Sequence, residues 1–396
     1  MDKKINCPLY GFISVTPRMC SIIDTPEFKR LHNLRQLGVT YLIYPSANHT
    51  RFEHSLGVSH LAKILATSLQ KNQPELGISD NEIELIQISG LIHDIGHGPF
   101  SHLYDEEFSH MLCHETRGQK IFSEMITKYK LQFTRDEVKF IINCIDPPKN
   151  LEGNYKFQIV SNKLCSIDVD KIDYIQRDNY HLGFGLNEKY LRLIHDCRVV
   201  KIHDIEVLGW PNKLEDEVLS LFASRYRLHK NVYNHHTVKA AEYEILKIMK
   251  KIIDNNIPPW NSLTDNIINI PINNEIIKMK EAFDMREFPK LLHEDVIYEP
   301  QIGEFMELSY KKFVEKMINK NYKLYFQKIT IGFGFKNVLK NVVYFKGTDY
   351  TGYNVEKYNT FMAPSTTNEI IIRIYVEKPY LEICKQEFET IFEDNI

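Results

Sequence analysis

Two segments place a potential metal ligand on the apolar face of a predicted helix. In ISDNEIELIQISGLIHD, Ser79 begins the helix with a capping box, and the apolar stripe leads at helical spacing to Asp94. In RFEHSLGVSHLAKILATSL, the stripe Val58, Leu61, Leu65 and Leu69 begins at His54. A carboxylate that faces a core is costly unless it is paired or bound to a metal. One inward histidine alone is more often an ordinary core residue, but imidazole and carboxylate together predict a transition-metal site.

The stretch LIHDIGHGPFSH adds a dense group of histidines. Five of the sixteen histidines lie within 22 residues: His93, His97, His102, His110 and His114. Gly96, Gly98 and Pro99 are expected to end the helix and turn the chain tightly. Such a turn would present His97 and His102 to whatever Asp94 holds. A surface cluster of histidines would not explain the inward position of Asp94.

Two further helical faces carry polar groups. At helical spacing, Asp170, Tyr174 and Asp178 share a face with Lys171 beside them, although acidic helices are usually solvated. A second stripe suits a polyphosphate with an attached group and consists of Arg225, His229 and Tyr233. The sequence has no P-loop, no GxSxG and no HExxH motif.

The elements that must position these residues are mostly helical. A chain of 396 residues is too long for one simple core, so we expect a large domain and a smaller lobe. Residues 1–18 look extended, 19–200 mostly helical, 198–211 like a hairpin, and 214–254 and 275–322 helical again. The last 70 residues alternate β-branched and aromatic runs before a final helix at 379–393. We predict a mainly α fold: a helical core over 1–255 and a C-terminal helical and α+β lobe over 256–396.

Charge and cysteine content limit the binding partners and the cellular compartment that we expect. The net charge is −3, but residues 311–346 carry nine lysines and one acid, which suits an anionic partner such as a single-stranded nucleic acid or is simply a solvated face. Seven cysteines without a CxxC pair argue against a disulfide framework. With no apolar leader and no long apolar run, we expect an intracellular, reducing compartment without membrane contact. Cytoplasmic and nuclear locations stay open.

The pattern His54, His93–Asp94 and Asp170 resembles that of the HD phosphohydrolase superfamily. Longer stretches are more specific: IIDTPEFKRL, QLG, RFEHSLGV, LIHDIGHGPFSH, IVSN, and IDVDKIDYIQRD followed by HLG. Together they resemble the eukaryotic sterile-alpha-motif and HD-domain dNTP triphosphohydrolases and their microbial relatives. The resemblance begins near residue 5 and continues more weakly into the C-terminal lobe. We expect no sterile-alpha-motif domain ahead of it.

The resemblance implies a role for each matching residue. The metal ligands would be His54, His93, Asp94 and Asp170, with Fe, Mn, Zn or Ni between them and Mg²⁺ on the phosphates. Catalytic roles, as general acid or in positioning, would fall to His97, His102, Asp105 and His114. The substrate-binding set would be Arg51, Gln36, Leu37, Lys171, Tyr174, Asp178, Arg225, His229 and Tyr233. Within that set Leu37 would crowd a 2′-hydroxyl and Asp178 would accept from the 3′-hydroxyl. The family has a glutamine where this chain has Asn234.

The implied reaction converts a dNTP and water into a deoxynucleoside and tripolyphosphate, with a protonated His102 donating to the departing 5′-oxygen. The family resemblance also implies activation by GTP or a dNTP, with assembly into a dimer or tetramer. The family's guanine site uses an Asp, a Gln and an Arg, where this chain has Asp24, Lys29 and His32. A neighbouring dNTP site would be lined by Arg192, Lys213, Arg286 and Lys290.

Two other functions stay open at this point. One is an HD phosphohydrolase or phosphodiesterase for another nucleotide, such as a cyclic dinucleotide, an oligonucleotide or an alarmone. The other is a nucleotide-sensing or nucleic-acid-binding scaffold, which the lysines at 311–346 favour mildly. Contact of Leu37, Tyr174 and Asp178 with a sugar would distinguish the dNTP reaction from the first alternative. Affinity for single strands that survives loss of His93 and Asp94 would favour the second.

Overall fold

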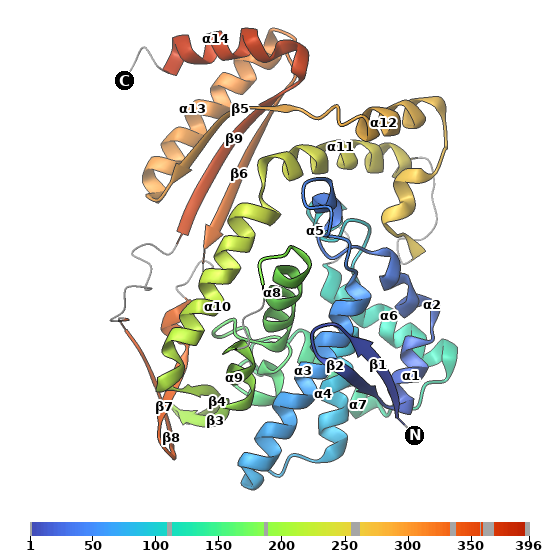
Figure 1. Ribbon diagram of the computed structural model, residues 1–396, viewed down its shortest axis with the longest axis vertical. Coiled ribbons are helices and arrows are strands. Elements are labelled where there is room, and N and C mark those ends of the chain that lie inside the picture. The colour runs from blue at the N-terminus through green and yellow to red at the C-terminus, as the bar shows by residue number, and fades with distance from the viewer. Residues whose placement is uncertain are drawn as a thin grey trace. The chain divides into compact units, whose positions relative to one another are not determined.

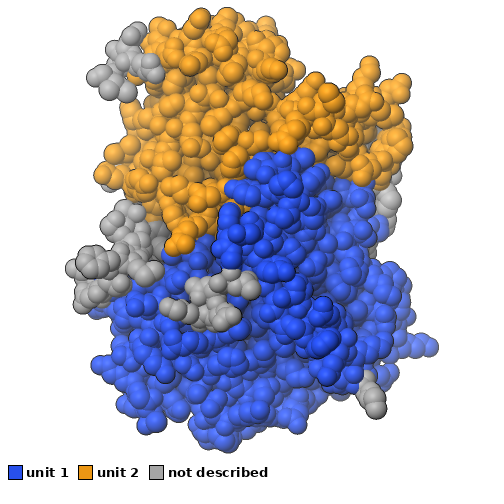
Figure 2. Space-filling view, viewed as in Figure 1, with its two compact units in different colours: residues 1–225, 258–267, 338–363 blue, residues 226–257, 268–337, 364–396 orange. Residues whose placement is uncertain are grey.

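The computed structural model describes residues 2–108, 113–185, 189–254, 262–332, 338–356, 358 and 368–392 (Figure 1). These residues form two compact units that alternate along the chain (Figure 2). Unit 1 comprises residues 1–225, 258–267 and 338–363, and unit 2 comprises residues 226–257, 268–337 and 364–396. The division differs from the consecutive segments 1–255 and 256–396 expected from the sequence, because two strands within residues 343–354 return to pair with strands of unit 1.

Unit 1 is mainly helical. Its helices are α1 (Pro17–Ile23), α2 (Pro26–Lys29), α3 (Arg51–Asn72), α4 (Asp80–Ile92), α5 (His102–Phe108), α6 (His114–Tyr129), α7 (Arg135–Ile145), α8 (Val169–His181), α9 (Lys189–His195) and most of α10 (Glu215–Leu228). The predicted capping box at Ser79 is present and begins α4. A mainly α fold with a smaller strand-containing region is therefore confirmed.

Helices α3 and α4 form the centre of unit 1. A Cβ on Gly90 of α4 would lie only 3.1 Å from the backbone of Ser59, so glycine lets the two helix backbones approach closely. The predicted stripe of α3 is buried, from Val58 at 0% exposed to Leu65 at 3%. Strands β1 (Lys3–Cys7) and β2 (Gly11–Val15) form an antiparallel hairpin that packs on this core. The close α3–α4 contact fixes the end of α4 beside the start of α3.

A second strand group closes one end of unit 1. The predicted hairpin is present as β3 (Arg198–Ile202) and β4 (Ile205–Pro211). Strands β7 (Val343–Lys346) and β8 (Asp349–Asn354) pair with β4 and β3 respectively, so the four strands close into a small ring. The apolar interior contains Val200, Val207, Val343 and Phe345.

Unit 2 is an α+β unit built on a three-stranded antiparallel sheet. The strand order is β5 (Lys290–Ile297), β9 (Asn368–Val376) and β6 (Leu324–Gly332). Helices α13 (Pro300–Asn319) and α14 (Leu381–Phe392) share one apolar core with the sheet (Figure 1). Arg373 and Tyr375 of β9 donate hydrogen bonds to the carbonyl oxygens of Asn234 and His236, just before and at the start of α11 (His236–Ile253). Helix α12 (Asn274–Asp284) completes the unit.

Three local predictions were wrong. The single helix predicted at 214–254 is α10, a π-helical turn at His229–Tyr233, and then α11. The helical segment predicted at 275–322 contains strand β5, and strand β8 was not predicted at all. Strand β5 reads KLLHEDVI, whose charged residues hide the strand pattern. Its pairing with β9, from Lys290↔Val376 to Ile297↔Ile370, determines its conformation instead.

Five of the nine lysines of residues 311–346 pair with three acids of unit 2. Lys311 and Lys328 pair with Glu307, Lys316 and Lys320 with Glu387, and Lys323 with Glu377. These three carboxylates offset part of the local positive charge. Among the described residues no helix is both long and apolar enough to cross a membrane. All seven cysteines are free thiols.

Candidate metal centre

The four predicted metal ligands meet in unit 1. His54 comes from α3, His93 and Asp94 from the end of α4, and Asp170 from the first turn of α8. The Nε2 atom of His54 lies 3.2 Å from Nε2 of His93 and 3.1 Å from Oδ1 of Asp170. Oδ1 of Asp94 lies 3.4 Å from Nε2 of His93. The inward orientation predicted for His54 and Asp94 is confirmed, since they are 1% and 5% exposed.

Both imidazoles use their Nδ1 atoms elsewhere. Nδ1 of His93 lies 2.8 Å from the Gly90 carbonyl oxygen, which can only accept. Nδ1 of His54 lies 2.8 Å from Oδ2 of Asp173. Each Nδ1 therefore carries a proton, which leaves the two Nε2 atoms, 3.2 Å apart, to share a further proton or a cation. Lone pairs at this separation repel unless a proton or a cation lies between them, so the residues fit a bound metal ion.

Asp173 and Arg177 form the support behind His54. Arg177 donates to both carboxylate oxygens of Asp173 at 2.9 Å, and both side chains are fully buried. A Cβ on Gly57 of α3 would lie 1.9 Å from Oδ1 of Asp173, so glycine leaves room for this carboxylate. Carboxylate–histidine–metal arrangements of this kind orient the imidazole and raise its basicity.

The electrostatics of the cluster favour a cation. Burial opposes a charge on His54, but Asp170 and Asp173 outweigh it and raise the pKa of His54 to about 10. Burial likewise opposes the ionised form of Asp94, yet Arg51 and the neighbouring histidines hold the pKa of Asp94 well below its usual value. The carboxylates are thus ionised, and a divalent ion would replace the protons on the imidazoles.

Four further predicted residues, His97, His102, Asp105 and His114, lie beside the metal ligands. Nε2 of His97 is 3.2 Å from Oδ1 of Asp94, and its ring stacks on that of His114 at 4.0 Å. The ring of His102 lies 5.2 Å from that of His97. Nδ1 of His114 lies 2.8 Å from Oδ2 of Asp105. The other carboxylate oxygen of Asp105, Oδ1, accepts a hydrogen bond from Arg117. His110 of the same motif lies outside the described residues.

His97 and His102 are both held neutral in the free protein. Burial, followed by the positive charges of Arg51 and His114, lowers the pKa of His97 well below its usual value. The same causes lower the pKa of His102 to about 4, although its ring still reaches solvent. The protonated His102 of the sequence-based mechanism is therefore not the form of the free protein at neutral pH. A bound polyphosphate would oppose the two positive charges and raise the pKa of His102 again.

Buried arginines hold the turn that carries His97. A Cβ on Gly96 would lie 2.0 Å from the His114 carbonyl oxygen, so the turn packs directly against the start of α6. Arg30 donates to the carbonyl oxygens of Ile95 and His97 at 2.8 Å, and Arg117 donates to that of Gly96. Neither arginine was predicted to act here. Arg30 is 65 residues away from Ile95 in the sequence, and Arg117 lies outside the stretch LIHDIGHGPFSH.

Replacing Arg30 with methionine should destabilise unit 1 by roughly 2–4 kcal/mol, because the carbonyl oxygens of Ile95, His97 and Leu263 lose their buried donor. Chemical unfolding monitored by circular dichroism measures this change. Arg135→Met, at an exposed arginine, is the matched control and should cost less than about 0.5 kcal/mol. Equal stability of the two variants would contradict the supporting role of Arg30.

The predicted sugar-reading residues lie on a connected loop. Asp265 accepts hydrogen bonds from the backbone amides of Arg35 and Phe100 at 2.8 and 2.7 Å, so it ties the loop before Gln36 to the histidine turn. The Oε1 atom of Gln36 is buried and has no hydrogen-bond partner among the described residues. Leu37 is half-buried. An unsatisfied buried acceptor is the group that a ligand hydroxyl would satisfy.

Asp178 is more enclosed than predicted. It is 1% exposed, and its Oδ1 atom lies 2.7 Å from Nε2 of His49, a residue that the sequence did not single out. The ring of His49 stacks on that of His181 at 4.3 Å, and in the part of the chain that the structure describes its buried Nδ1 atom has no hydrogen-bond partner. In this structure His49 therefore occupies one oxygen of the carboxylate expected to read a 3′-hydroxyl.

The predicted phosphate contacts are only partly gathered. Lys171 pairs with Asp168 at 2.8 Å, and burial opposes its charge while Asp168 and Asp170 raise its pKa. A side-chain hydrogen bond joins Tyr174 and Arg225 within unit 1. Arg51 donates to Oδ2 of Asp94 at 2.5 Å and to Ser101 at 2.7 Å. The predicted stripe is divided between the two units, since Arg225 ends a segment of unit 1 while His229 and Tyr233, whose rings lie 4.9 Å apart, belong to unit 2.

The predicted regulatory residues are divided between the two units. Asp24 pairs with Lys29 at 3.5 Å on an exposed surface. Arg192 pairs with Glu217, and Lys213 lies 3.7 Å from Asp196, both within unit 1. Arg286 and Lys290 belong to unit 2, the former with a left-handed φ of 58°. These contacts place acids beside two of the four proposed cations.

Comparison with known proteins agrees with the position of the cluster. The HD domain profile matches residues 51–178, which contain all four predicted ligands. A putative HD domain-containing protein of Acanthamoeba polyphaga mimivirus is 32% identical over 99% of this chain and 96% of its own length. This chain belongs to the HD-domain family.

Other relatives match a part of this chain. The deoxynucleoside triphosphate triphosphohydrolase SAMHD1 of Gallus gallus is 36% identical over 63% of this chain and 45% of its own length. SAMHD1 of Homo sapiens is 36% identical over 59% of this chain and 42% of its own length. The chain is thus homologous to SAMHD1, while the alignments span less than half of those longer proteins.

Proposed function

We propose that this protein is a metal-dependent dNTP triphosphohydrolase, which converts a dNTP and water into a deoxynucleoside and tripolyphosphate. The observation that supports this most is the cluster of His54, His93, Asp94 and Asp170 beside His97 and His102. It combines a buried ligand set with neutral imidazoles that can exchange protons. The printed names of the SAMHD1 relatives supply the substrate class.

A divalent transition ion, Fe, Mn, Zn or Ni, would be held by His54, His93, Asp94 and Asp170, and would activate water and polarise a phosphate oxygen. Asp173 fixes the imidazole of His54 through its Nδ1 atom. Arg51 orients Asp94 through a 2.5 Å hydrogen bond. Mg²⁺ would accompany the substrate phosphates. The protein thus contributes a rigid site in which few groups need to reorganise.

The remaining groups would bind the substrate and move protons. Lys171, Tyr174 and Arg225 would contact the phosphates and offset their negative charge. Water would attack the α-phosphorus as the bond to the 5′-oxygen breaks, and His102 would donate its proton to that oxygen. Bound phosphates supply the negative charge that protonates His102 beforehand. Asp105 and His114 would hold His97 and His102 in place through the stacked rings.

Product identification tests the proposal. The purified chain is incubated with each of the four dNTPs, Mg²⁺ and either Mn²⁺ or Fe²⁺, with and without GTP, and the products are separated by chromatography. We expect a deoxynucleoside and intact tripolyphosphate in equal amounts. Release of a deoxynucleoside monophosphate would instead indicate attack at a different bond. Failure to turn over any dNTP under all conditions would refute the proposal.

We also propose that a bound nucleotide regulates the activity. We infer that GTP or a dNTP acts as activator and promotes assembly into a dimer or tetramer, as the family resemblance implies. Lys29 and His32 replace the expected glutamine and arginine, so discrimination in favour of guanine should be weak. Sedimentation velocity with GTP, dATP or no nucleotide checks both points. An unchanged sedimentation coefficient together with unchanged turnover would contradict activation by assembly.

Replacing Leu37 with alanine should relax discrimination against ribonucleotides by about tenfold, because removing the half-buried side chain makes room for a 2′-hydroxyl. The ratio of kcat/KM for dATP to that for ATP measures this. Leu308→Ala, at an exposed leucine of α13, is the control and should leave the ratio unchanged. The alternative phosphodiesterase function predicts no change in either variant.

A further inference from the structure

A buried carboxylate, that of Asp265, joins two segments of unit 1 to which the proposed function gives different tasks. Asp265 is 4% exposed and begins the 3-10 helical turn Asp265–Asn269. Its Oδ2 atom accepts from the backbone amide of Arg35 at 2.8 Å, and its Oδ1 atom accepts from the backbone amide of Phe100 at 2.7 Å. Burial raises the pKa of Asp265, and the two amides and the charges of Arg35 and Arg51 oppose that rise. Both oxygens therefore hold backbone rather than another side chain.

The first of these amides belongs to the segment that carries the predicted sugar-reading residues. Gln36 and Leu37 directly follow Arg35 in the sequence. The backbone amide of Gln36 donates to the carbonyl oxygen of His49 at 3.0 Å, which holds one side of this segment against the residues before α3. The contact between Asp265 and Arg35 holds the same segment toward the histidine turn, residues 97–102. The position of Leu37 thus depends on this carboxylate.

The second amide belongs to a turn with an unfavourable backbone conformation. Phe100 and Ser101 have left-handed φ angles of 55° and 57°. Residues with a Cβ rarely adopt this conformation, and it persists only where the surroundings enforce it. Asp265 holds the amide of Phe100, and the Ser101 hydroxyl oxygen accepts from Nε of Arg51 at 2.7 Å. His102 follows directly and begins α5, so release of Phe100 would let the turn relax and would move His102.

We propose that Asp265 is a positioning residue that holds the sugar-reading segment at a fixed separation from the histidine turn, and thereby sets the preference for a deoxyribose. The inference rests on the proposed dNTP hydrolysis, whose choice of sugar it explains. The two segments are neighbours, since a Cβ on Gly38 would lie 3.9 Å from the carbonyl oxygen of Phe100. Leu37 lies on one segment and His102 on the other. A change in their separation would alter both the room left for a 2′-hydroxyl and the alignment of the 5′-oxygen.

Two substitutions at this position grade the loss. Asp265→Asn keeps one acceptor oxygen but turns an NH₂ group toward the other amide, so it should release one segment, whereas Asp265→Ala releases both. We expect the ratio of kcat/KM for dATP to that for ATP to fall by about threefold in Asp265→Asn and about tenfold in Asp265→Ala. The kcat for dATP should fall by about 100-fold in Asp265→Ala, as a misplacement of about 1 Å does in other enzymes. The ratio does not depend on how much of the protein is folded, so a purely structural role would leave it unchanged.

A double substitution tests whether Asp265 acts through Leu37. Leu37→Ala alone removes the side chain that is expected to exclude a 2′-hydroxyl. Adding Asp265→Ala should then change the dATP-to-ATP ratio no further, because the side chain that Asp265 positions is already absent. Effects on the ratio that multiply in the double variant would mean that the two residues act independently, and would overturn the proposal. Asp265→Asn, which conserves the shape of the side chain, takes the place of Asp265→Ala in every comparison if the alanine variant does not fold.

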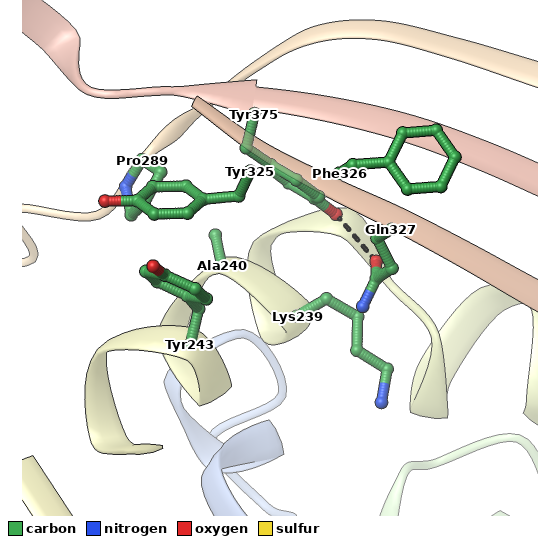
Figure 3. A pocket seen from close by; sticks show the side chains of 8 residues that line it. All are labelled: Lys239, Ala240, Tyr243, Pro289, Tyr325, Phe326, Gln327 and Tyr375. Carbon is green, nitrogen blue, oxygen red and sulfur yellow. Dashed lines mark hydrogen bonds between the residues drawn. The ribbon is translucent and has the colours of Figure 1, made fainter. Parts of the chain in front are cut away.

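Tyr375→Phe is the matched control, because Tyr375 is as buried as Asp265 and also makes two hydrogen-bond contacts, but in unit 2. Its hydroxyl group lies 3.2 Å from the carbonyl oxygen of His236 and 3.3 Å from Oε1 of Gln327 (Figure 3). Loss of this hydroxyl should leave the dATP-to-ATP ratio unchanged. Asn266→Ala, at the exposed neighbour of Asp265 in the same turn, should also leave it unchanged.

Equilibrium binding separates this proposal from the proposed hydrolysis. Affinities for dATP and ATP are measured by calorimetric titration with Ca²⁺ in place of the other divalent ions. A parent that hydrolyses no dNTP, but binds dATP more tightly than ATP and loses that preference in Asp265→Ala, would refute the hydrolysis and support the positioning role. A parent that hydrolyses dNTPs and keeps its preference in folded Asp265→Ala would refute the positioning role alone. A parent without any preference for dATP, in binding or in kcat/KM, would also overturn it.

Discussion

Asp94→Asn should lower dNTP hydrolysis by at least about 10³-fold, because it removes a charged ligand from the centre where His54 and His93 converge. The change also leaves Arg51, which donates to this carboxylate at 2.5 Å, without its ionised acceptor. Turnover measured by release of tripolyphosphate and metal content measured by atomic emission should fall together.

The matched control is Asp284→Asn, at a 58% exposed aspartate of unit 2 that pairs with Lys280. It should keep full activity and metal content. A thermal melt shows whether Asp94→Asn remains folded. Activity within tenfold of the parent in a folded Asp94→Asn protein would refute the assignment of the metal centre, whatever the substrate is.

Asp173→Ala should have the second-largest effect and should act on both stability and metal binding. Arg177 would remain fully buried without its partner, and breaking a buried pair of this kind costs about 3–5 kcal/mol. His54 would also lose the acceptor of its Nδ1 proton, which should weaken metal affinity by about 10–100-fold. Urea unfolding and competition with a metal chelator measure the two effects separately.

Asp173→Asn separates the two roles of this residue. The amide can still accept from His54 through its oxygen, but it cannot neutralise Arg177. We expect it to recover part of the metal affinity and little of the stability. Asp284→Ala again serves as the exposed control. If Asp173→Ala unfolds at the same urea concentration as the parent, the buried pair does not support the site as inferred.

The candidate metal ligands could be predicted because they lie on helices or within two residues of a helix end. His54 and Asp94 each continue an apolar stripe, so helical spacing alone indicated their inward orientation. The capping box at Ser79 fixed where α4 begins, and the glycine-rich turn after Asp94 indicated where it ends. His93 and Asp170 followed from the HD resemblance, and the structure brings them within 3.5 Å of each other.

Predictions were weaker where local sequence and tertiary pairing disagree. The polar sequence of β5 looks helical, and only its pairing with β9 makes it a strand. The long helix predicted at 214–254 is interrupted by a π-helical turn at His229–Tyr233. The regular helical spacing assumed from Arg225 to Tyr233 therefore does not continue through this turn.

The sequence by itself indicated the candidate ligand set, the helical core and the family, because these depend on residue types at short spacings and on the motifs that carry the resemblance. Only the tertiary structure decided what supports the set. Asp265 accepts hydrogen bonds from residues 35 and 100, each more than 160 positions away in the sequence. His49 contacts Asp178 over a sequence separation of 129 residues. Arg30 donates hydrogen bonds to Ile95 and His97 of the histidine turn over sequence separations of 65 and 67 residues. Such contacts follow from how the helices pack, and no local pattern in one sequence records that packing.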